Sequence, residues 1–163
     1  MGTTAGATRF DYVTIIRATA EQLRQALTAP EYLRRYHGGH GPESDWKPGS
    51  TVKWSMSPEG DYRDYGQVVL ESDAPRRLSY TWHNYQPEIA SLFGWSDEQL
   101  AELRKEPISR VAFEIEPATE TSVKLTVVHD GFAPDSEMLK GISQGWPAIL
   151  SNLKTLLETG ETL

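Results

Sequence analysis

Residues 145–160 read Gly-Trp-Pro-Ala-Ile-Leu-Ser-Asn-Leu-Lys-Thr-Leu-Leu-Glu-Thr-Gly, and this segment is the most informative part of the chain. With the residues before it, it places apolar side chains at steps of three and four, the period of a helix buried along one side. Pro134 precedes the run and Gly160 follows it, which suits a helix from Ser136 to Glu158. The apolar stripe consists of Met138, Ile142, Trp146, Ile149, Leu153, Leu156 and Leu157.

At roughly 1.5 Å per residue, such a helix is about 34 Å long, which is enough to cross a whole sheet. Pro147 lies inside it and lacks an amide donor, so we expect a kink or a fresh start near Gly145. A helix of this length with one apolar face needs a large apolar surface to lie on. The functional question is therefore what lies between the helix and that surface.

Length and composition are those of one ordinary globular domain. The chain has 163 residues, 38% of them hydrophobic, which is enough to bury a core without disulfides. It contains no cysteine, which excludes disulfides, thiolate metal sites and cysteine nucleophiles. The net charge of −7 argues against a nucleic-acid partner, because phosphate binding requires a basic surface. No apolar run approaches the roughly 20 residues of a membrane span.

Residues 1–8 are expected to form a disordered lead-in that does not resemble a signal peptide, and residues 9–160 a single domain. The lack of such a signal and of cysteine favours a cytoplasmic protein. No pattern in the chain calls for a cofactor, and we predict none. A homodimer stays open as an alternative.

The predicted elements run in the order of one strand, two short helices, several strands and the long helix. Thr19 to Gln22 has capping-box spacing and predicts a helix through Leu27, and Pro30 precedes a second helix from Glu31 to Tyr36. Residues 37–42 are predicted to form a loop. The fold class is α+β, with a strongly curved antiparallel sheet of six or seven strands wrapped around one long C-terminal helix. Alternating patterns predict strands at 10–17, 51–56, 65–72, 77–83, 110–116 and 122–130.

Residues 84–109 fit neither a strand nor a turn. Ser96 to Gln99 again has capping-box spacing, and Leu100 with Leu103 predicts a short amphipathic helix that Pro107 ends. One interpretation is an insertion that packs its own small apolar cluster. The other is a lid over the mouth of a cavity, since insertions of this length often serve function.

Several segments of the chain match one known family in the right order, over about residues 10–160. They are similar to the START-like superfamily, in the branch of the homologues of the activator of the heat-shock ATPase. The segments are Pro-Glu-Tyr-Leu-Arg-Arg-Tyr-His-Gly-Gly at 30–39, Trp-Lys-Pro-Gly-Ser at 46–50, Tyr-Gly-Gln-Val-Val-Leu at 65–70, Pro-Arg-Arg-Leu-Ser-Tyr-Thr-Trp at 75–82 and Gly-Trp at 145–146.

The resemblance implies a helix-grip fold with a cavity between the sheet and the long helix. It leaves the activity open, because the superfamily includes lipid carriers, polyketide cyclases, hormone receptors and co-chaperone domains. The chain departs from its relatives at Arg24, where an aromatic residue is common, and in the longer insertion at 84–109.

Strand parity predicts which side chains line that cavity. Alternate residues of the strands at 51–56, 77–83, 110–116 and 122–130 are apolar and should face the helix. Several tryptophans, a tyrosine, a methionine and a histidine on one enclosed surface favour a ligand pocket, although a solid core is the alternative. The predicted ligand-binding residues are Trp54, Met56, Tyr80, Trp82, Phe113, His129, Trp146 and Leu150.

The titratable residues do not form a pattern that is typical of metal binding or catalysis. His129 should face inward, His83 should lie on the opposite face or at the rim, and His37 and His40 flank two glycines in a loop. No histidine pair has the spacing of a zinc motif on a helix, so we predict no metal site. No serine sits in a nucleophile elbow and no phosphate-binding loop is present, so we predict no catalytic residues beyond the alternative below.

Three functions therefore remain. We favour a non-enzymatic protein that binds a small apolar or aromatic molecule in the cavity. The second is a cyclase-type or hydrolase-type enzyme that uses His129 and a tyrosine such as Tyr80 as acid–base groups. The third is a protein-interaction module that resembles the co-chaperone domain. The cavity is expected to open toward Tyr36, His37 and residues 84–109.

Overall fold

Seven strands form one antiparallel sheet in the order β1-β7-β6-β5-β4-β3-β2. This agrees with the predicted six or seven strands. The computed structural model describes residues 8–55, 61–82, 87, 90–91 and 94–163. The strands are β1 (Arg9–Ile16), β2 (Gly41–Glu43), β3 (Thr51–Ser55), β4 (Tyr62–Asp73), β5 (Arg77–Thr81), β6 (Arg110–Thr119) and β7 (Ser122–Asp130).

Two capping boxes fix the starts of short helices, as their spacing predicts. The Thr19 hydroxyl accepts from the Gln22 amide at 3.0 Å, and the Gln22 side chain accepts from the Thr19 amide at 2.8 Å. Ser96 and Gln99 exchange the same pair of bonds. Each box satisfies amide groups that have no partner inside the helix. The short helices whose bounds lie within the described residues are α1 (Ala20–Thr28), α2 (Pro30–Tyr36) and α4 (Asp97–Leu103).

The long C-terminal helix, α5 (Glu137–Thr159), has both predicted ends. The Ser136 hydroxyl accepts from the Leu139 amide at 3.3 Å, and Gly160 ends the helix in the left-handed conformation at φ 83°. The helix continues through Pro147 as one element, so the expected fresh start near Gly145 is wrong. Its buried side chains are Met138, Leu139, Ile142, Trp146, Leu150, Leu153 and Leu156.

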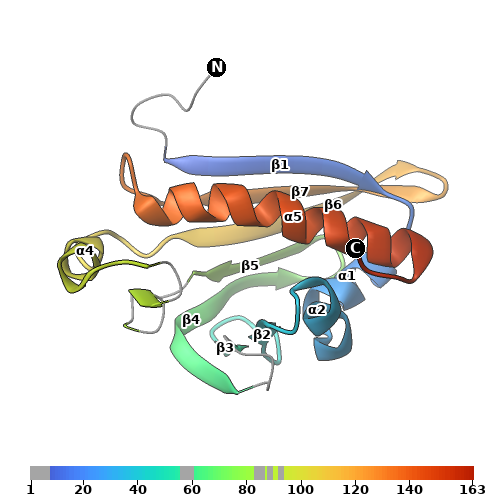
Figure 1. The fold of residues 1–163 in the computed structure, drawn as a ribbon. Helices are drawn as coiled ribbons and strands as arrows, with labels where there is room; N and C mark the ends of the chain where they lie inside the picture. Colours follow the sequence, from blue (N-terminus) through green and yellow to red (C-terminus); the bar gives the residue numbers. More distant parts are fainter. Residues whose placement is uncertain (1–7, 56–60, 83–86, 88–89, 92–93) are drawn as a thin grey trace.

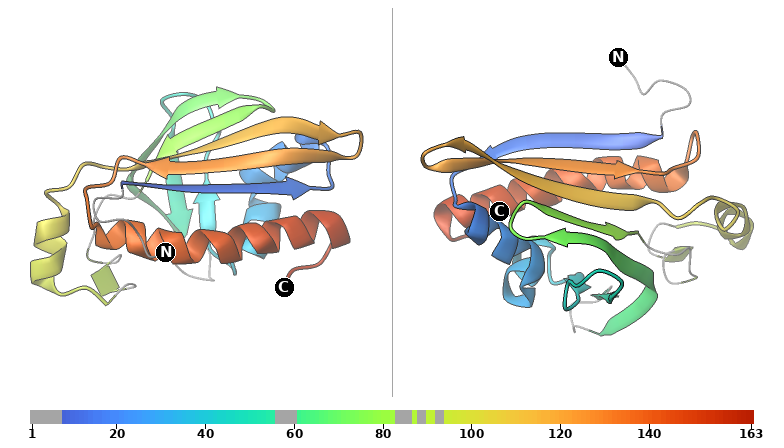
Figure 2. Two further views of the ribbon diagram at one scale, coloured as in Figure 1. Left: turned by 90° about the horizontal axis from the view of Figure 1, so that it is seen from above. Right: turned by 180° about the vertical axis from the view of Figure 1, so that it is seen from behind.

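The sheet curves so that the helices lie on its concave side. Register shifts interrupt the ladder between β3 and β4 at Val52/Lys53 and between β4 and β5 at Val69/Glu71. Such irregularities bend and twist strands locally. In Figures 1 and 2, β4 bends away from the plane of β1, β7 and β6, while α5 runs along the sheet with α1 and α2 beside its C-terminal half. This is the predicted α+β, helix-grip arrangement.

The loop predicted at 37–42 is only partly a loop. Its last two residues belong to β2, which pairs with β3 so that Gly41 lies opposite Ser55 and Pro42 opposite Trp54. β2 is an edge strand of the sheet, so Pro42 removes no hydrogen bond that the sheet needs. The strand β4 also begins earlier than expected, at Tyr62, because its pairing with β3 extends it beyond the alternating pattern.

The inner faces of the strands carry the core, as parity predicts. Val111, Phe113 and Ile115 of β6 are buried, as are the corresponding residues of β7, with Val111 opposite His129 and Phe113 opposite Val127. On the other face, Val13 and Ile15 of β1 and Val68 and Leu70 of β4 are exposed. None of the described helices is long and apolar enough to cross a membrane.

Candidate functional site

Seven of the eight predicted site residues lie together in the buried region between the sheet and α5. Each of the seven has at most 6% of its surface exposed. Five are supplied by β3, β5, the residue after β5, β6 and β7, and two by α5. They are Trp54, Tyr80, Trp82, Phe113, His129, Trp146 and Leu150. The eighth, Met56, lies outside the described residues, as does His83.

Six of these side chains form one continuous aromatic cluster, consisting of Trp54, Tyr80, Trp82, Phe113, His129 and Trp146. Trp82 is its centre. The Trp82 ring centroid lies 5.1 Å from that of Trp54, 5.5 Å from Trp146 and 4.8 Å from the His129 ring. Phe113 continues the cluster at 5.8 Å from Trp146 and 6.0 Å from Tyr80. These separations are those of directly packed aromatic rings.

His129 is held by hydrogen bonds from both sides. The Trp146 indole N–H donates to its Nδ1 at 3.0 Å, and its Nε2 lies 3.1 Å from the Ser109 hydroxyl. An indole can only donate, so Nδ1 carries no proton and Nε2–H donates to Ser109. The imidazole is therefore neutral, and both nitrogens are used to join β7 to α5 and to Ser109. The structure thus assigns His129 a structural role, and it does not point a free nitrogen at a ligand.

Two buried tyrosines differ in how their hydroxyl groups are satisfied. The Tyr36 hydroxyl, at the end of α2, donates to the Ala26 carbonyl at 2.8 Å. Tyr80, on β5, is only 3% exposed, yet no hydrogen bond joins its hydroxyl to any residue in the described part of the chain. Burial raises the pKa of Tyr80 above its ordinary value. The Tyr80 hydroxyl is therefore a neutral donor whose proton has no protein acceptor among those residues.

Trp46 completes the surroundings of Tyr80 and was not predicted to be a site residue. Its ring lies 5.6 Å from the Tyr80 ring, and its indole N–H donates to the Thr28 carbonyl at 2.9 Å. Its backbone is in the left-handed region at φ 59°, which turns the loop and directs the indole inward. A large aromatic residue in an otherwise polar loop was the signal that could have identified it.

His37 packs beside Trp54 at the predicted mouth. Its ring lies 4.8 Å from that of Tyr36 and 5.7 Å from that of Trp54. Burial and, to a smaller extent, the neighbouring His40 together lower the pKa of His37 to about 3. His37 is therefore neutral at physiological pH. Within the described ranges, no three histidine, aspartate or glutamate side chains are grouped closely enough to hold a metal ion.

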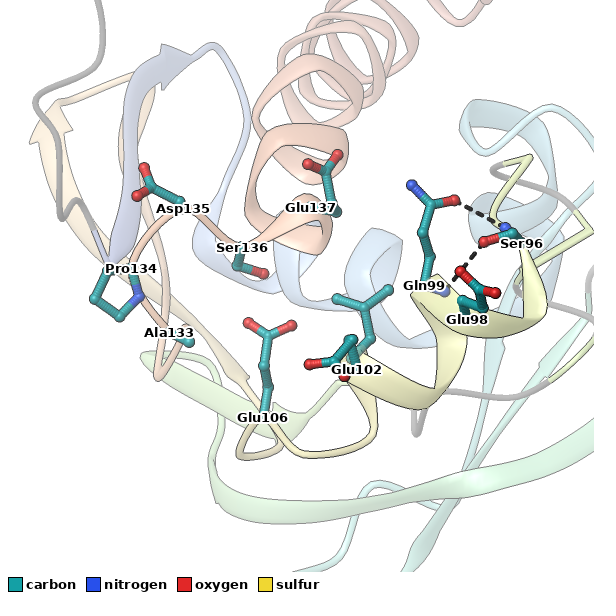
Figure 3. Close-up of a pocket in the computed structure, with 11 residues that line it drawn as sticks. Ser96, Glu98, Gln99, Glu102, Glu106, Ala133, Pro134, Asp135, Ser136 and Glu137 are labelled. Atoms are coloured by element: carbon teal, nitrogen blue, oxygen red, sulfur yellow. Dashed lines mark hydrogen bonds between the residues drawn. The ribbon is translucent and has the colours of Figure 1, made fainter.

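An acidic pocket of about 470 Å³ lies between α4 and the start of α5 (Figure 3). Five carboxylates line it, those of Glu98, Glu102, Glu106, Asp135 and Glu137. Burial raises the pKa of Glu106, and a hydrogen bond to Ser136 acts in the opposite direction. Its Oε1 has no hydrogen-bond partner among the described residues. None of the predicted ligand-binding residues lines this pocket, so it is separate from the aromatic cluster.

Comparison with known proteins places the chain among proteins of one family. The family model of activator of Hsp90 ATPase homolog 1-like proteins matches residues 17–158. No curated protein matches the chain. Similar solved structures include a protein from Mesorhizobium loti, with 25% sequence identity and a TM-score of 0.65 over 91% of this chain and 96% of that one.

Two further similar structures are described as an activator of another protein and as a dimer. One is an HSP90 activator from Plasmodium falciparum, 20% identical, with a TM-score of 0.66 over 93% of this chain and 96% of that one. The other is an Aha1 dimer from Colwellia psychrerythraea, 19% identical, with a TM-score of 0.63 over 94% and 98%. At these identities the similarity shows the fold alone.

Proposed function

The chain belongs to the family of activator of Hsp90 ATPase homolog 1-like proteins, and on that premise we propose that it binds a small apolar or aromatic molecule between the sheet and α5. The observation that carries the proposal is the Tyr80 hydroxyl, which lies among aromatic rings and has no protein acceptor in the described residues. Polar groups that lie in apolar surroundings without a protein partner occur mainly where a ligand or water satisfies them.

The surroundings of that hydroxyl support the same function. Trp46, Trp82 and Phe113 surround Tyr80 with ring centroids 5.6–6.4 Å away. Aromatic walls with one or two polar groups are the usual composition of a small-molecule site. The rings supply apolar contact area, and the hydroxyl supplies orientation.

The alternative of a cyclase-type or hydrolase-type enzyme has no free general base at His129. A catalytic His129 would need a ring nitrogen free to take a proton from a substrate, but Nδ1 accepts from Trp146 and Nε2 contacts Ser109. Tyr80 is a poor proton donor in acid–base chemistry because its raised pKa keeps the proton on the phenol. The described cluster therefore favours binding over catalysis.

A protein-interaction module is the second candidate. It is favoured by the similarity to the Plasmodium falciparum HSP90 activator and by four large apolar side chains exposed on the outer face of the sheet. These are Val13, Ile15, Val68 and Leu70. They lie on β1 and β4, which three strands separate, so they do not form one continuous patch.

The test begins with native mass spectrometry of the purified protein, in which a retained small molecule adds a fixed mass to the chain. Titration with a fluorescent apolar probe follows, with quenching of tryptophan emission as the signal. We expect one probe per chain. Trp82→Ala should weaken binding at least about tenfold, because Trp82 is central to the cluster, and the control Glu71→Ala on the outer face should not.

The interaction module predicts a different result. It predicts no saturable probe binding and a change in the ATPase rate of purified Hsp90 when the protein is added. That combination would replace our proposal with the second candidate.

A further inference from the structure

The edge strand β1 presents main-chain hydrogen-bonding groups on the side that faces away from β7. It is the first strand in the order of the sheet and lies at the border of the sheet in Figure 1. An exposed strand edge is a template for pairing with another strand. We propose that residues 8–12 of β1 pair antiparallel with the same residues of a second copy of the chain, which gives a weak homodimer whose sheet continues across both copies.

Two contacts with the C-terminal half of α5 show which groups of β1 point to this free edge. The Ile15 carbonyl accepts a hydrogen bond from Lys154. The amide of Arg17, just after the strand, donates to Glu158 at 2.9 Å. Main-chain groups alternate between the two sides of a strand, so the odd-numbered residues of β1 present theirs to the free edge.

The odd-numbered residues before Ile15 are Arg9, Asp11 and Val13. Apart from the ladder with β7, no hydrogen bond among the described residues involves their main-chain groups. The even-numbered Thr8 behaves in the opposite way, because its carbonyl accepts from the Phe132 amide, which follows β7, at 3.3 Å. The N-terminal half of β1 therefore offers open donors and acceptors at Arg9 and Asp11.

Charge and α5 together select one register for the two strands. Registers that place Ile15 opposite a partner residue compete with Lys154 for the Ile15 carbonyl. Registers centred on Arg9 or on Asp11 place two like charges opposite each other, which is destabilising. The register centred on Phe10 places Arg9 opposite Asp11 of the second copy. The twofold axis repeats this pair, so two cross-strand ion pairs form.

The side chains on both faces of the strand suit this register. On the outer face, Arg9 Nε donates to Asp11 Oδ2 at 2.9 Å, and both side chains are about half exposed. They can therefore contact the second copy while they stay partly in water. On the inner face, Phe10 stacks on Tyr12 with ring centroids 6.4 Å apart. Phe10 lies opposite itself across the twofold axis, so pairing buries apolar ring surface.

The size of the contact predicts that the dimer is weak. One short strand segment from each copy buries much less than the roughly 1,200–2,000 Å² of a stable interface. The dimer should therefore form only at high protein concentration. It should also dissociate as salt is added, because salt screens exposed ion pairs.

Sedimentation velocity over a series of protein concentrations measures the dimer, and charge reversal tests the register. Asp11→Arg or Arg9→Asp alone places like charges opposite each other, and each should weaken dimerisation at least about tenfold. The double variant Arg9→Asp/Asp11→Arg should dimerise like the wild type. A mixture of the two single variants should form a heterodimer. The control Glu116→Arg reverses a charge on β6, away from the edge, and should leave dimerisation unchanged.

Amide exchange followed by NMR locates the contact independently of charge. The amides of Arg9 and Asp11 should exchange more slowly as the protein concentration rises. The amides of Phe10 and Tyr12, which point to β7, should change little.

The contrary outcomes are distinct. A protein that is monomeric at every concentration overturns the proposal, and so does a dimer that neither single variant weakens, because another surface would then hold it. Slow exchange of the Arg9 and Asp11 amides in the dilute monomer would show that the chain covers this edge itself. If both single variants dissociate but neither their mixture nor the double variant associates, the register centred on Phe10 is overturned.

Discussion

At the scale of single residues, Tyr36 and Tyr80 differ in whether the hydroxyl group has a protein acceptor. Replacing Tyr36 with phenylalanine leaves the Ala26 carbonyl without its donor, so we expect a loss of about 1–2 kcal/mol in the free energy of unfolding. Replacing Tyr80 removes a hydroxyl that has no acceptor among the described residues, so the ligand-free protein should be unchanged or up to about 1 kcal/mol more stable.

Urea denaturation of the two variants beside the wild type measures this contrast. Equal destabilisation by both substitutions would mean that the Tyr80 hydroxyl has a partner as good as that of Tyr36. The measurement requires no ligand, so it tests the site separately from any binding experiment.

His37 makes stability depend on pH. Its folded-state pKa of about 3 lies below the ordinary value of 6.5, so the unfolded chain binds more protons between these values. The contribution to stability is complete above about pH 6.5 and is lost as the pH falls, with a slope of up to about 1.4 kcal/mol per pH unit. His37→Gln should therefore flatten the pH dependence between pH 7 and pH 5.

Denaturation curves collected across that range for the wild type and His37→Gln provide the measurement. Asp11, Asp45 and Glu158 have lowered pKa values and titrate at more acidic pH, so they contribute little in this window. An identical slope for both proteins would show that His37 is protonated in the fold at its ordinary pKa.

At the scale of the helix, one glycine inside α5 and the glycine that follows it should respond in opposite directions to the same substitution. Gly145 lies inside the helix, and a Cβ added there meets no atom within 4 Å, so Gly145→Ala should stabilise the protein by about 0.5–1 kcal/mol. Gly160 ends the helix at φ 83°, where a Cβ is strained, so Gly160→Ala should destabilise it by about 1 kcal/mol.

Thermal denaturation of the two variants gives the sign of each effect directly. A destabilised Gly145→Ala would indicate that the residues around the proline leave less room than the structure shows. Because Pro147 already removes one hydrogen bond from this turn, a better helix former beside it should be an improvement.

At the scale of the whole molecule, Trp146 ties the helix to the sheet. Its ring packs against Phe113 and Trp82, and its indole N–H bonds to His129. Trp146→Ala should therefore lower the free energy of unfolding by about 3–5 kcal/mol, because packing is lost and the His129 Nδ1 loses its donor. The control Gln144→Ala, at an exposed position two residues earlier, should cost less than about 0.5 kcal/mol. Urea denaturation compares them, and similar small losses would contradict the packing of α5 on the sheet.

Local patterns in the sequence predict the elements of the fold and the faces that they bury. The helical stripe around Trp146, the cap at Ser136 and the stop at Gly160 are local patterns, and they suffice to predict α5 within one residue at each end. The alternation of strands such as 110–116 likewise predicted the buried face that carries Phe113. Local periodicity fixes such features because it depends only on the geometry of the backbone.

The hydrogen-bond partners of the polar side chains, by contrast, follow from the way in which the elements pack. His129 was correctly predicted to face inward, but its partners Trp146 and Ser109 are 17 and 20 residues away along the chain. The neighbour of Tyr80, Trp46, is likewise distant along the chain, and it lies in a loop where its own backbone is left-handed. Hydrogen bonds between distant residues depend on the packing of elements, which no local pattern encodes, so the partners of His129 could not be predicted from the sequence.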